Sequence, residues 1–366
     1  MNVLPELPAS ASLFEPLALR TVTLRNRIAL SPMAQYSAVD GVANDWHFVH
    51  YASRAAGGAG AIVVEATAVR PEGRISPGDL GLWEDAQVEP LARVAAAIAA
   101  HGAVPGIQIA HAGRKACVAA PWHGGEAVPV AQGGWTPLGP GEEPFGPAYH
   151  APRPMVAADL EAAVAAFAAA ARRAHRAGFR LLEVHAAHGY LLHEFLSPLV
   201  NRRTDAYGGP FESRARLPLE VVGAVRAAWP AELPLWVRIS ATDWAPGGWD
   251  EPEAVRLAAR LRDAGADLVD CSSAGAVATQ KVAVGPGYQV PFAERIRREA
   301  GVRTGAVGLI TEPAQAEEIL RAGRADVVLL GRVMLREPYW PLRAATVLGA
   351  EGPWPLQYRR GRPGSA

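Results

Sequence analysis

The sequence predicts an α/β fold in which the chain forms a single (β/α)8 barrel, or TIM barrel, and three observations lead to this class. Short apolar runs recur eight times along the 366 residues, and they are continuous, as in parallel strands that helices cover. Longer helical patterns separate the runs, which makes eight β-then-α units. The alternative, a doubly wound sheet, needs a G-x-G-x-x-G fingerprint after its first strand, and the segment after Met33 contains none.

The predicted strands cover 27–33, 61–67, 105–110, 179–185, 235–240, 267–272, 303–308 and 326–331. Helices are predicted at 159–177, 252–264 and 312–322, and each is followed directly by a glycine that can end it. We expect Asp159 to cap the first of these helices, while a Thr-Glu-Pro segment opens the third.

We expect residues 1–366 to form one domain, because no linker or internal repeat divides the chain. The segment 111–156 interrupts the β/α rhythm and is rich in Pro, Gly and Trp. A loop of this length inside a compact domain is usually functional, and its place after the third strand predicts a lid over the barrel mouth. Residues 351–366 form a C-terminal tail.

Composition excludes several classes of function. The chain has 36 basic and 36 acidic residues, so its charge does not favour nucleic acid or an anionic membrane as a partner. Cys117 and Cys271 are too few for a disulfide framework or a four-cysteine metal site. No signal peptide is apparent, and the most apolar run, 162–171, is too short to span a bilayer. We expect a soluble, cytoplasmic protein.

Polar side chains gather where the predicted strands end, which in a barrel of this type is where the active site lies. They are Gln108, Arg238, His185, His188, Tyr190 and Tyr36. The ends of strands seven and eight, the usual phosphate seat, carry Gly308, Gly331 and Arg332. Glycine lets backbone N–H groups approach a phosphate, and arginine can clamp it, although each glycine taken singly could simply end a strand.

Three roles are open for His185 and His188 of the segment H-A-A-H-G-Y. A metal site is the least favoured, because no helical frame, third ligand or H-E-x-x-H accompanies the pair. Two structural histidines bonded to backbone are the second role. The third is donation of hydrogen bonds to a carbonyl oxygen that gains negative charge. Tyr190, whose phenol has an ordinary pKa of ~10, can deliver a proton.

Several motifs together resemble the old yellow enzymes, a family of flavin-dependent reductases. H-A-A-H-G-Y-L-L-H-E-F-L-S-P, followed by N-R-R-T-D-A-Y-G-G-P-F-E-S-R, resembles the family signature. The opening L-F-E-P, L-R-N-R-I and S-P-M, the segment Q-I-A-H-A-G-R-K and the late A-V-G-L-I are similar too. D-W-H, H-Y-A-S-R and the C-terminal Q-Y-R-R-G resemble the thermophilic-like, YqjM-like bacterial branch. The resemblance runs from Leu13 to Gly361.

The resemblance implies a barrel that binds FMN, takes hydride from NADPH and reduces alkenes activated by a carbonyl or nitro group. It implies that His185 and His188 bind the substrate oxygen, that Tyr190 protonates the α-carbon and that Tyr36 shapes the pocket. The residues implied to contact the flavin are Ser31, Pro32, Met33, Ala34, Ala66 and Gln108, with Arg238 beside the N1/C2 edge and Gly308, Gly331 and Arg332 at the phosphate. It implies no metal.

In the branch that the chain resembles, a C-terminal arginine reaches the neighbouring subunit's active site. Arg360 aligns best with this arginine, with Arg359 as the second choice, and we therefore expect a homodimer or homotetramer. The chain departs from the branch at Ala34, where a cysteine near the flavin is usual. We expect the reduced flavin to be less stabilised as a result.

Three other classes remain to be distinguished. The longer relatives that carry an iron–sulfur site need clustered cysteines that this chain lacks. A barrel lyase that forms a lysine imine needs a lysine at a strand end, and we place Lys115 and Lys281 in loops. A flavin-binding protein without turnover is made plausible only by Ala34.

Overall fold

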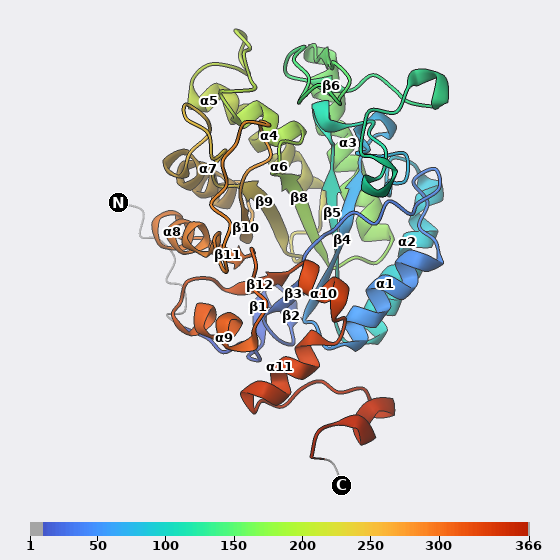
Figure 1. The fold of residues 1–366 in the computed structure, drawn as a ribbon, viewed down its shortest axis with the longest axis vertical. Helices are drawn as coiled ribbons and strands as arrows, with labels where there is room; N and C mark the ends of the chain where they lie inside the picture. The colour runs from blue at the N-terminus through green and yellow to red at the C-terminus, as the bar shows by residue number, and fades with distance from the viewer. Residues whose placement is uncertain (1–9, 365–366) are drawn as a thin grey trace.

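Parallel strands close into a barrel in the computed structural model, which describes residues 10–364 (Figure 1). The strand order around the barrel is β10-β11-β12-β3-β4-β5-β8-β9, which confirms the predicted (β/α)8 class. The barrel strands are β3 (Ile28–Leu30), β4 (Ala61–Ala68), β5 (Val104–Ala110), β8 (Leu181–Ala186), β9 (Leu235–Ser240), β10 (Leu268–Ser272), β11 (Arg303–Ala306) and β12 (Val327–Leu330). Nearly every residue of these strands is buried, because side chains fill the barrel on one face and helices cover the other.

The helices surround the barrel on its outer side (Figure 1). They are α1 (Asp45–Ala56), α2 (Val88–Ala100), α3 (Ala157–Arg176), α4 (Leu191–Leu196), α5 (Phe211–Arg214), α6 (Arg216–Ala228), α7 (Glu251–Asp263), α8 (Val290–Ala300), α9 (Pro313–Arg321), α10 (Arg332–Arg336) and α11 (Trp340–Leu348). The three helices predicted from the sequence are present, each with its bounds shifted by one or two residues.

The prediction that Asp159 caps α3 is wrong. The residue at the cap position is Val156, and Asp159 lies three residues further on, where its carboxylate accepts a hydrogen bond from the Val156 N–H at 2.9 Å. The aspartate therefore still satisfies an otherwise free donor at the helix start, but it does so from inside the first turn. Asp250, by contrast, caps α7 through the Glu253 N–H.

Two short antiparallel strands, β1 (Leu17–Leu19) and β2 (Val22–Leu24), precede the barrel and were not predicted. The insertion 111–156 consists of turns and 3-10 segments with one small two-stranded sheet, β6 (Leu138–Gly139) and β7 (Arg153–Pro154). It lies at the end of the barrel where the strands terminate (Figure 1). At the opposite end of the view, α11 and the 3-10 segment η6 (Leu356–Gly361) form an arm that projects from the barrel.

Among residues 10–364, no helix combines the length and the apolar character that crossing a bilayer would require.

Candidate active site at the mouth of the barrel

The register of the parallel strands brings the polar residues of the barrel mouth together. His185 on β8 pairs with Arg238 on β9, and Arg238 pairs in turn with Asp270 on β10. One layer deeper, Gln108 on β5 pairs with Glu183 on β8. Because carboxyl ends of parallel strands meet at the same end of a barrel, residues distant in sequence form one polar surface there.

His185 is a neutral hydrogen-bond donor. Its Nδ1 accepts a hydrogen bond from the Ala187 N–H at 3.2 Å, so the proton of the neutral ring is on Nε2. Burial, reinforced by the nearby charge of Arg238, lowers the pKa of His185 well below its ordinary value. The side chain is only 3% exposed, and its remaining N–H can therefore serve a ligand oxygen in a nearly water-free setting.

His188 lies against His185 with its ring perpendicular, the ring centroids being 5.1 Å apart. Its Nε2 pairs with the Ser272 hydroxyl at 2.6 Å, which leaves Nδ1 for a ligand. Burial and the charge of Arg238 lower the pKa of His188 as well, so this imidazole is also neutral. The backbone has φ = 61°, a left-handed conformation that a residue with a Cβ rarely adopts.

Tyr190 completes the turn and precedes α4 directly. Its ring meets that of His185 edge-on, with centroids 5.0 Å apart. Burial first, and then the proximity of Tyr36 and Asp79, raise the pKa of the Tyr190 phenol far above its ordinary value. The phenol therefore keeps its proton at neutral pH, and it can act as a proton donor to a ligand that the histidines hold.

Tyr36 lies on the loop after β3, also in the left-handed region with φ = 51°. Its ring contacts Trp122 of the insertion edge-on at 5.6 Å, and burial raises the pKa of its phenol to about 12. The loop is anchored one residue earlier, where the Gln35 N–H donates to the buried carboxyl of Glu65 at 2.6 Å. Burial raises the pKa of Glu65 to about 8.

The expected flavin site can be tested for fit on the residues beneath the histidines. Arg238 is held by Asp270, with Nε to Oδ2 at 3.0 Å, and donates through Nη1 to the Ser31 hydroxyl at 3.1 Å. Gln108 donates to Glu183 at 2.7 Å, which leaves its carbonyl oxygen for a ligand N–H. A guanidinium and an amide at fixed orientation suit the polar edge of a flavin ring.

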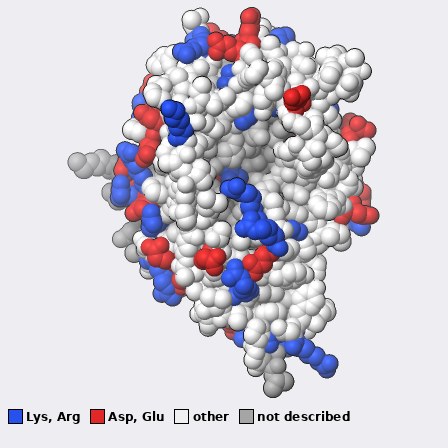
Figure 2. Space-filling model, in the orientation of Figure 1, with Lys and Arg blue, Asp and Glu red and all other residues white. Residues whose placement is uncertain are grey.

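The phosphate end fits as well. Arg238, Gly308, Gly331 and Arg332 line one cavity of about 250 Å3, and Arg336 adds a further guanidinium. Figure 2 shows the corresponding hollow, with Lys and Arg side chains gathered along its lower edge. Gly308 has φ = 120°, and an added Cβ would lie 3.0 Å from the Gln289 amide nitrogen, so only glycine suits this position.

The remaining predicted flavin contacts lie on two neighbouring strands. Ser31 and Pro32 are buried directly after β3, whereas Met33 and Ala34 are partly exposed on the loop that follows. Ala66 is buried in the irregular part of β4, where the register with β5 shifts between Val64 and Thr67.

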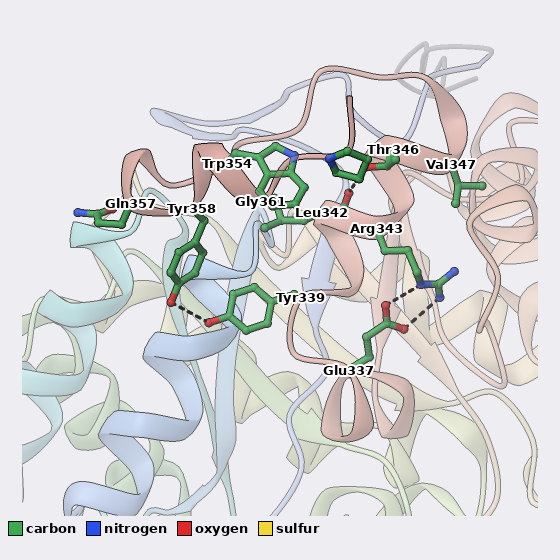
Figure 3. A pocket seen from close by; sticks show the side chains of 11 residues that line it. Glu337, Tyr339, Leu342, Arg343, Thr346, Val347, Trp354, Gln357, Tyr358 and Gly361 are labelled. Carbon is green, nitrogen blue, oxygen red and sulfur yellow. Dashed lines mark hydrogen bonds and ion pairs between the residues drawn. The ribbon is translucent and has the colours of Figure 1, made fainter. Parts of the chain in front are cut away.

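Arg360 is the one predicted site residue that lies away from this cluster. It belongs to η6 on the C-terminal arm and is exposed. The arm borders an apolar pocket of about 760 Å3, in which Tyr339 and Tyr358 face each other beside Leu342 and Trp354 (Figure 3). Within one chain, Arg360 on the arm therefore lies outside the site that His185 and His188 form.

The structure adds Lys115 to the site, although this residue lies in the loop after β5, as predicted, and not at a strand end. Lys115 ends the 3-10 turn η3 (Gly113–Lys115), five residues beyond β5, and its ammonium lies 5.1 Å from the ring centroid of Tyr190. The segment Q-I-A-H-A-G-R-K contained the signal, because a turn directly after a strand end stays at the barrel mouth. The buried carboxyls of Glu65, Glu183 and Asp270 were missed as well, since strand interiors seldom hold acids.

In the part of the chain that the structure describes, no group of three or more His, Cys, Asp or Glu side chains is arranged to hold a metal ion.

Sequence comparisons identify the family of the chain. The profile of the NADH:flavin oxidoreductase / NADH oxidase family matches residues 12–351. An NADPH dehydrogenase of Geobacillus thermodenitrificans (strain NG80-2) is 50% identical over 351 residues, which are 95% of this chain and 98% of the relative.

Solved structures give the same result. A 2-naphthoyl-CoA reductase in complex with 2-naphthoyl-CoA superposes with a TM-score of 0.82 at 26% identity, over 93% of this chain but only 52% of that one. The old yellow enzyme homologue of Zymomonas mobilis superposes with a TM-score of 0.77 at 25% identity, over 96% of this chain and 98% of its own.

Proposed function

The chain belongs to the NADH:flavin oxidoreductase / NADH oxidase family and is an FMN-dependent oxidoreductase with NADPH as hydride donor, and we propose that the bond it reduces is a carbon–carbon double bond. The substrates are alkenes activated by a carbonyl or nitro group: enones, enals, maleimides and nitroalkenes. The observation that carries this proposal is the pair of neutral, perpendicular imidazoles with a neutral phenol beside them.

Bound FMN supplies the hydride that goes to the β-carbon of the alkene. The side chains of the chain do the rest. His185 donates from Nε2 to the carbonyl or nitro oxygen, with His188 as the second donor, and both stabilise the negative charge that develops there. Tyr190 gives its proton to the α-carbon, so that one hydride and one proton together saturate the double bond.

The flavin pocket in this proposal has three parts. Ser31, Pro32, Met33, Ala34, Ala66 and Gln108 contact the ring system, and Tyr36 narrows the substrate side. Arg238, which Asp270 holds in place, would offer its charge to the edge of the ring that becomes anionic on reduction. Gly308, Gly331 and Arg332 hold the phosphate.

The C-terminal arm has a role in assembly in this proposal. Leu356 and Tyr358 on the arm and Val347 on α11 expose large apolar surfaces, which a second copy of the chain would cover. In a homodimer, or a homotetramer built from such dimers, Arg360 reaches the partner subunit's pocket. A native mass measurement checks the assembly, and a monomer at micromolar concentration would contradict this part.

Stopped-flow spectroscopy tests the function. The purified protein is expected to be yellow, to bleach with NADPH and to regain its colour when an enone, a maleimide or a nitroalkene is added. The corresponding saturated ketone, which lacks the double bond, is the matched control and is expected to leave the flavin bleached. Yellow protein that NADPH does not bleach would indicate a flavin-binding protein, and bleached protein that no activated alkene re-oxidises would contradict the proposed substrates.

A further inference from the structure

Lys115 connects the turn that carries His188 and Tyr190 to the loop after β10, which lies against that turn. Its ammonium donates to the His188 carbonyl oxygen at 2.7 Å and to the Gly275 carbonyl oxygen at 3.2 Å. An ammonium has three N–H donors, and two of them are used in this bridge. Lys115 thus joins three segments: the turn after β5, the turn after β8 and the loop after β10.

The peptide group between His188 and Gly189 is held at both ends. Lys115 donates to the His188 carbonyl oxygen, and the Gly189 N–H donates to His193 Nδ1 at 2.8 Å. His193 is oriented in turn by Asp243, with Nε2 to Oδ1 at 2.9 Å, and this carboxylate also accepts from the Ser197 hydroxyl. The orientation of one peptide plane is therefore fixed by side chains from two different elements.

This peptide needs to be held because the local backbone is crowded and unfavourable. His188 has φ = 61°, and a left-handed conformation at a residue with a Cβ costs on the order of 1–2 kcal/mol. Gly189 and Gly275 cross so closely that a Cβ on Gly189 would lie 1.9 Å from the Gly275 carbonyl oxygen. Two backbones in contact place their carbonyl groups side by side, and a cation between them offsets the repulsion.

The same ammonium also lies over two rings, 5.1 Å from the centroid of Tyr190 and 4.5 Å from that of Phe145. A cation over an aromatic face is attracted to it, so Lys115 favours one position of the Tyr190 ring. Burial and the charge of Arg238 lower the pKa of both histidines most, and the charge of Lys115 adds a smaller effect in the same direction. Burial lowers the pKa of Lys115 itself to about 8, with Glu194 opposing and Arg114 adding to this effect.

We propose that Lys115 is a positioning residue for proton delivery, which holds the His188–Tyr190 turn against the Gly275 loop and aims the Tyr190 phenol at the substrate. This inference deepens the proposed function and rests on it for the identity of the proton donor. Lys115 itself contacts neither the substrate nor the flavin in this role.

Lys115→Met tests the proposal, because it keeps the aliphatic stem and removes the donors and the charge. Lys281→Met is the matched control: it changes the chain's only other lysine, which is exposed. Hydrogen exchange of the FMN-bound protein is expected to accelerate in the peptides around 186–191 and 273–277 of Lys115→Met, whereas both peptides of Lys281→Met are expected to exchange at the native rate. Equal protection in both variants would overturn the proposal.

Half-reactions then separate positioning from general damage. Re-oxidation by an enone is expected to slow about 10-fold or more in Lys115→Met, because a small misplacement of a catalytic group is costly. Re-oxidation by ferricyanide, which takes electrons without a proton from Tyr190, is expected to keep its native rate. Equal slowing with both oxidants, or a native rate with the enone, would contradict a positioning role.

If Lys115→Met does not fold, Lys115→Gln replaces it, because glutamine is a shorter, uncharged donor. The outcomes that contradict the proposal are the same for this variant. Hydrogen exchange needs no substrate, so it tests the bridge from Lys115 to His188 and Gly275 separately from the reaction. If the native protein reduced none of the alkenes, the proposed function would fail while the exchange result still decided whether Lys115 holds the turn.

Discussion

The substrate wall of the site, formed by His185, His188 and Tyr190, and the flavin-edge wall, formed by residues 31–36 after β3, both contain backbone in the left-handed region but are held in different ways. His188 on the substrate wall and Tyr36, where the flavin-edge wall meets the substrate side, both adopt a left-handed conformation in the segment that follows a barrel strand. Lys115, His193 and Ser272 hold the first through side-chain contacts. The second is held through the residues beside it: Glu65 binds the Gln35 N–H, and the Asn44 amide donates to the Ser37 carbonyl oxygen.

The difference shows where the site must be exact. A phenol that delivers a proton has to sit within hydrogen-bond reach of one carbon, so its turn is fixed from three other elements of the fold. A residue that lines the flavin edge acts through its environment, and anchors on the neighbouring backbone suffice. We therefore expect changes on the substrate wall to alter rates strongly and changes on the flavin-edge wall to shift equilibria mildly.

The largest effect is expected for Tyr190→Phe. Removal of the phenolic proton is expected to slow re-oxidation by an enone about 100-fold or more, the usual contribution of a general acid. Reduction by NADPH is expected to stay near the native rate, because no proton from Tyr190 is needed in that half-reaction. Stopped-flow traces at the flavin absorbance measure both steps, and equal losses in the two would break the distinction between the walls.

A smaller effect is expected for His185→Ala. The variant leaves a ligand oxygen without its donor in a buried setting, which costs ~1–3 kcal/mol, or about 5- to 150-fold in Kd for a phenolic ligand or an enone. Titration of the flavin spectrum with a phenol measures this constant. The FMN content of the variant serves as the control for the fold, and native phenol affinity would show that His185 is structural.

The smallest effect is expected for Ala34→Cys on the flavin-edge wall. A thiol adds a weak polar contact to the reduced flavin, worth ~0.5 kcal/mol, so the midpoint potential is expected to rise by roughly 10 mV. Ala34→Val is the control, because it fills space without a polar contact. A redox titration with a dye of known potential checks both, and an unchanged potential in the cysteine variant would remove Ala34 as the cause of any unusual flavin behaviour.

Most of the fold could be predicted because its signals are local. Continuous apolar runs identified all eight barrel strands, and glycines marked the ends of α3, α7 and α9. The errors arose where a side chain had two ways to satisfy the same donor. Asp159 binds the Val156 N–H from the third helical position, a contact that residue type and spacing do not distinguish from a cap.

The site divides in the same way. The sequence by itself determined the barrel and the residues at its strand ends, because strand periodicity and the position of each loop are local properties. Only the tertiary structure decided the proton position on His185, the neutral state of both imidazoles and the bridge from Lys115 to His188 and Gly275. Hydrogen-bond partners and burial depend on residues that are distant in the chain, and no pattern of spacing specifies which of them meet.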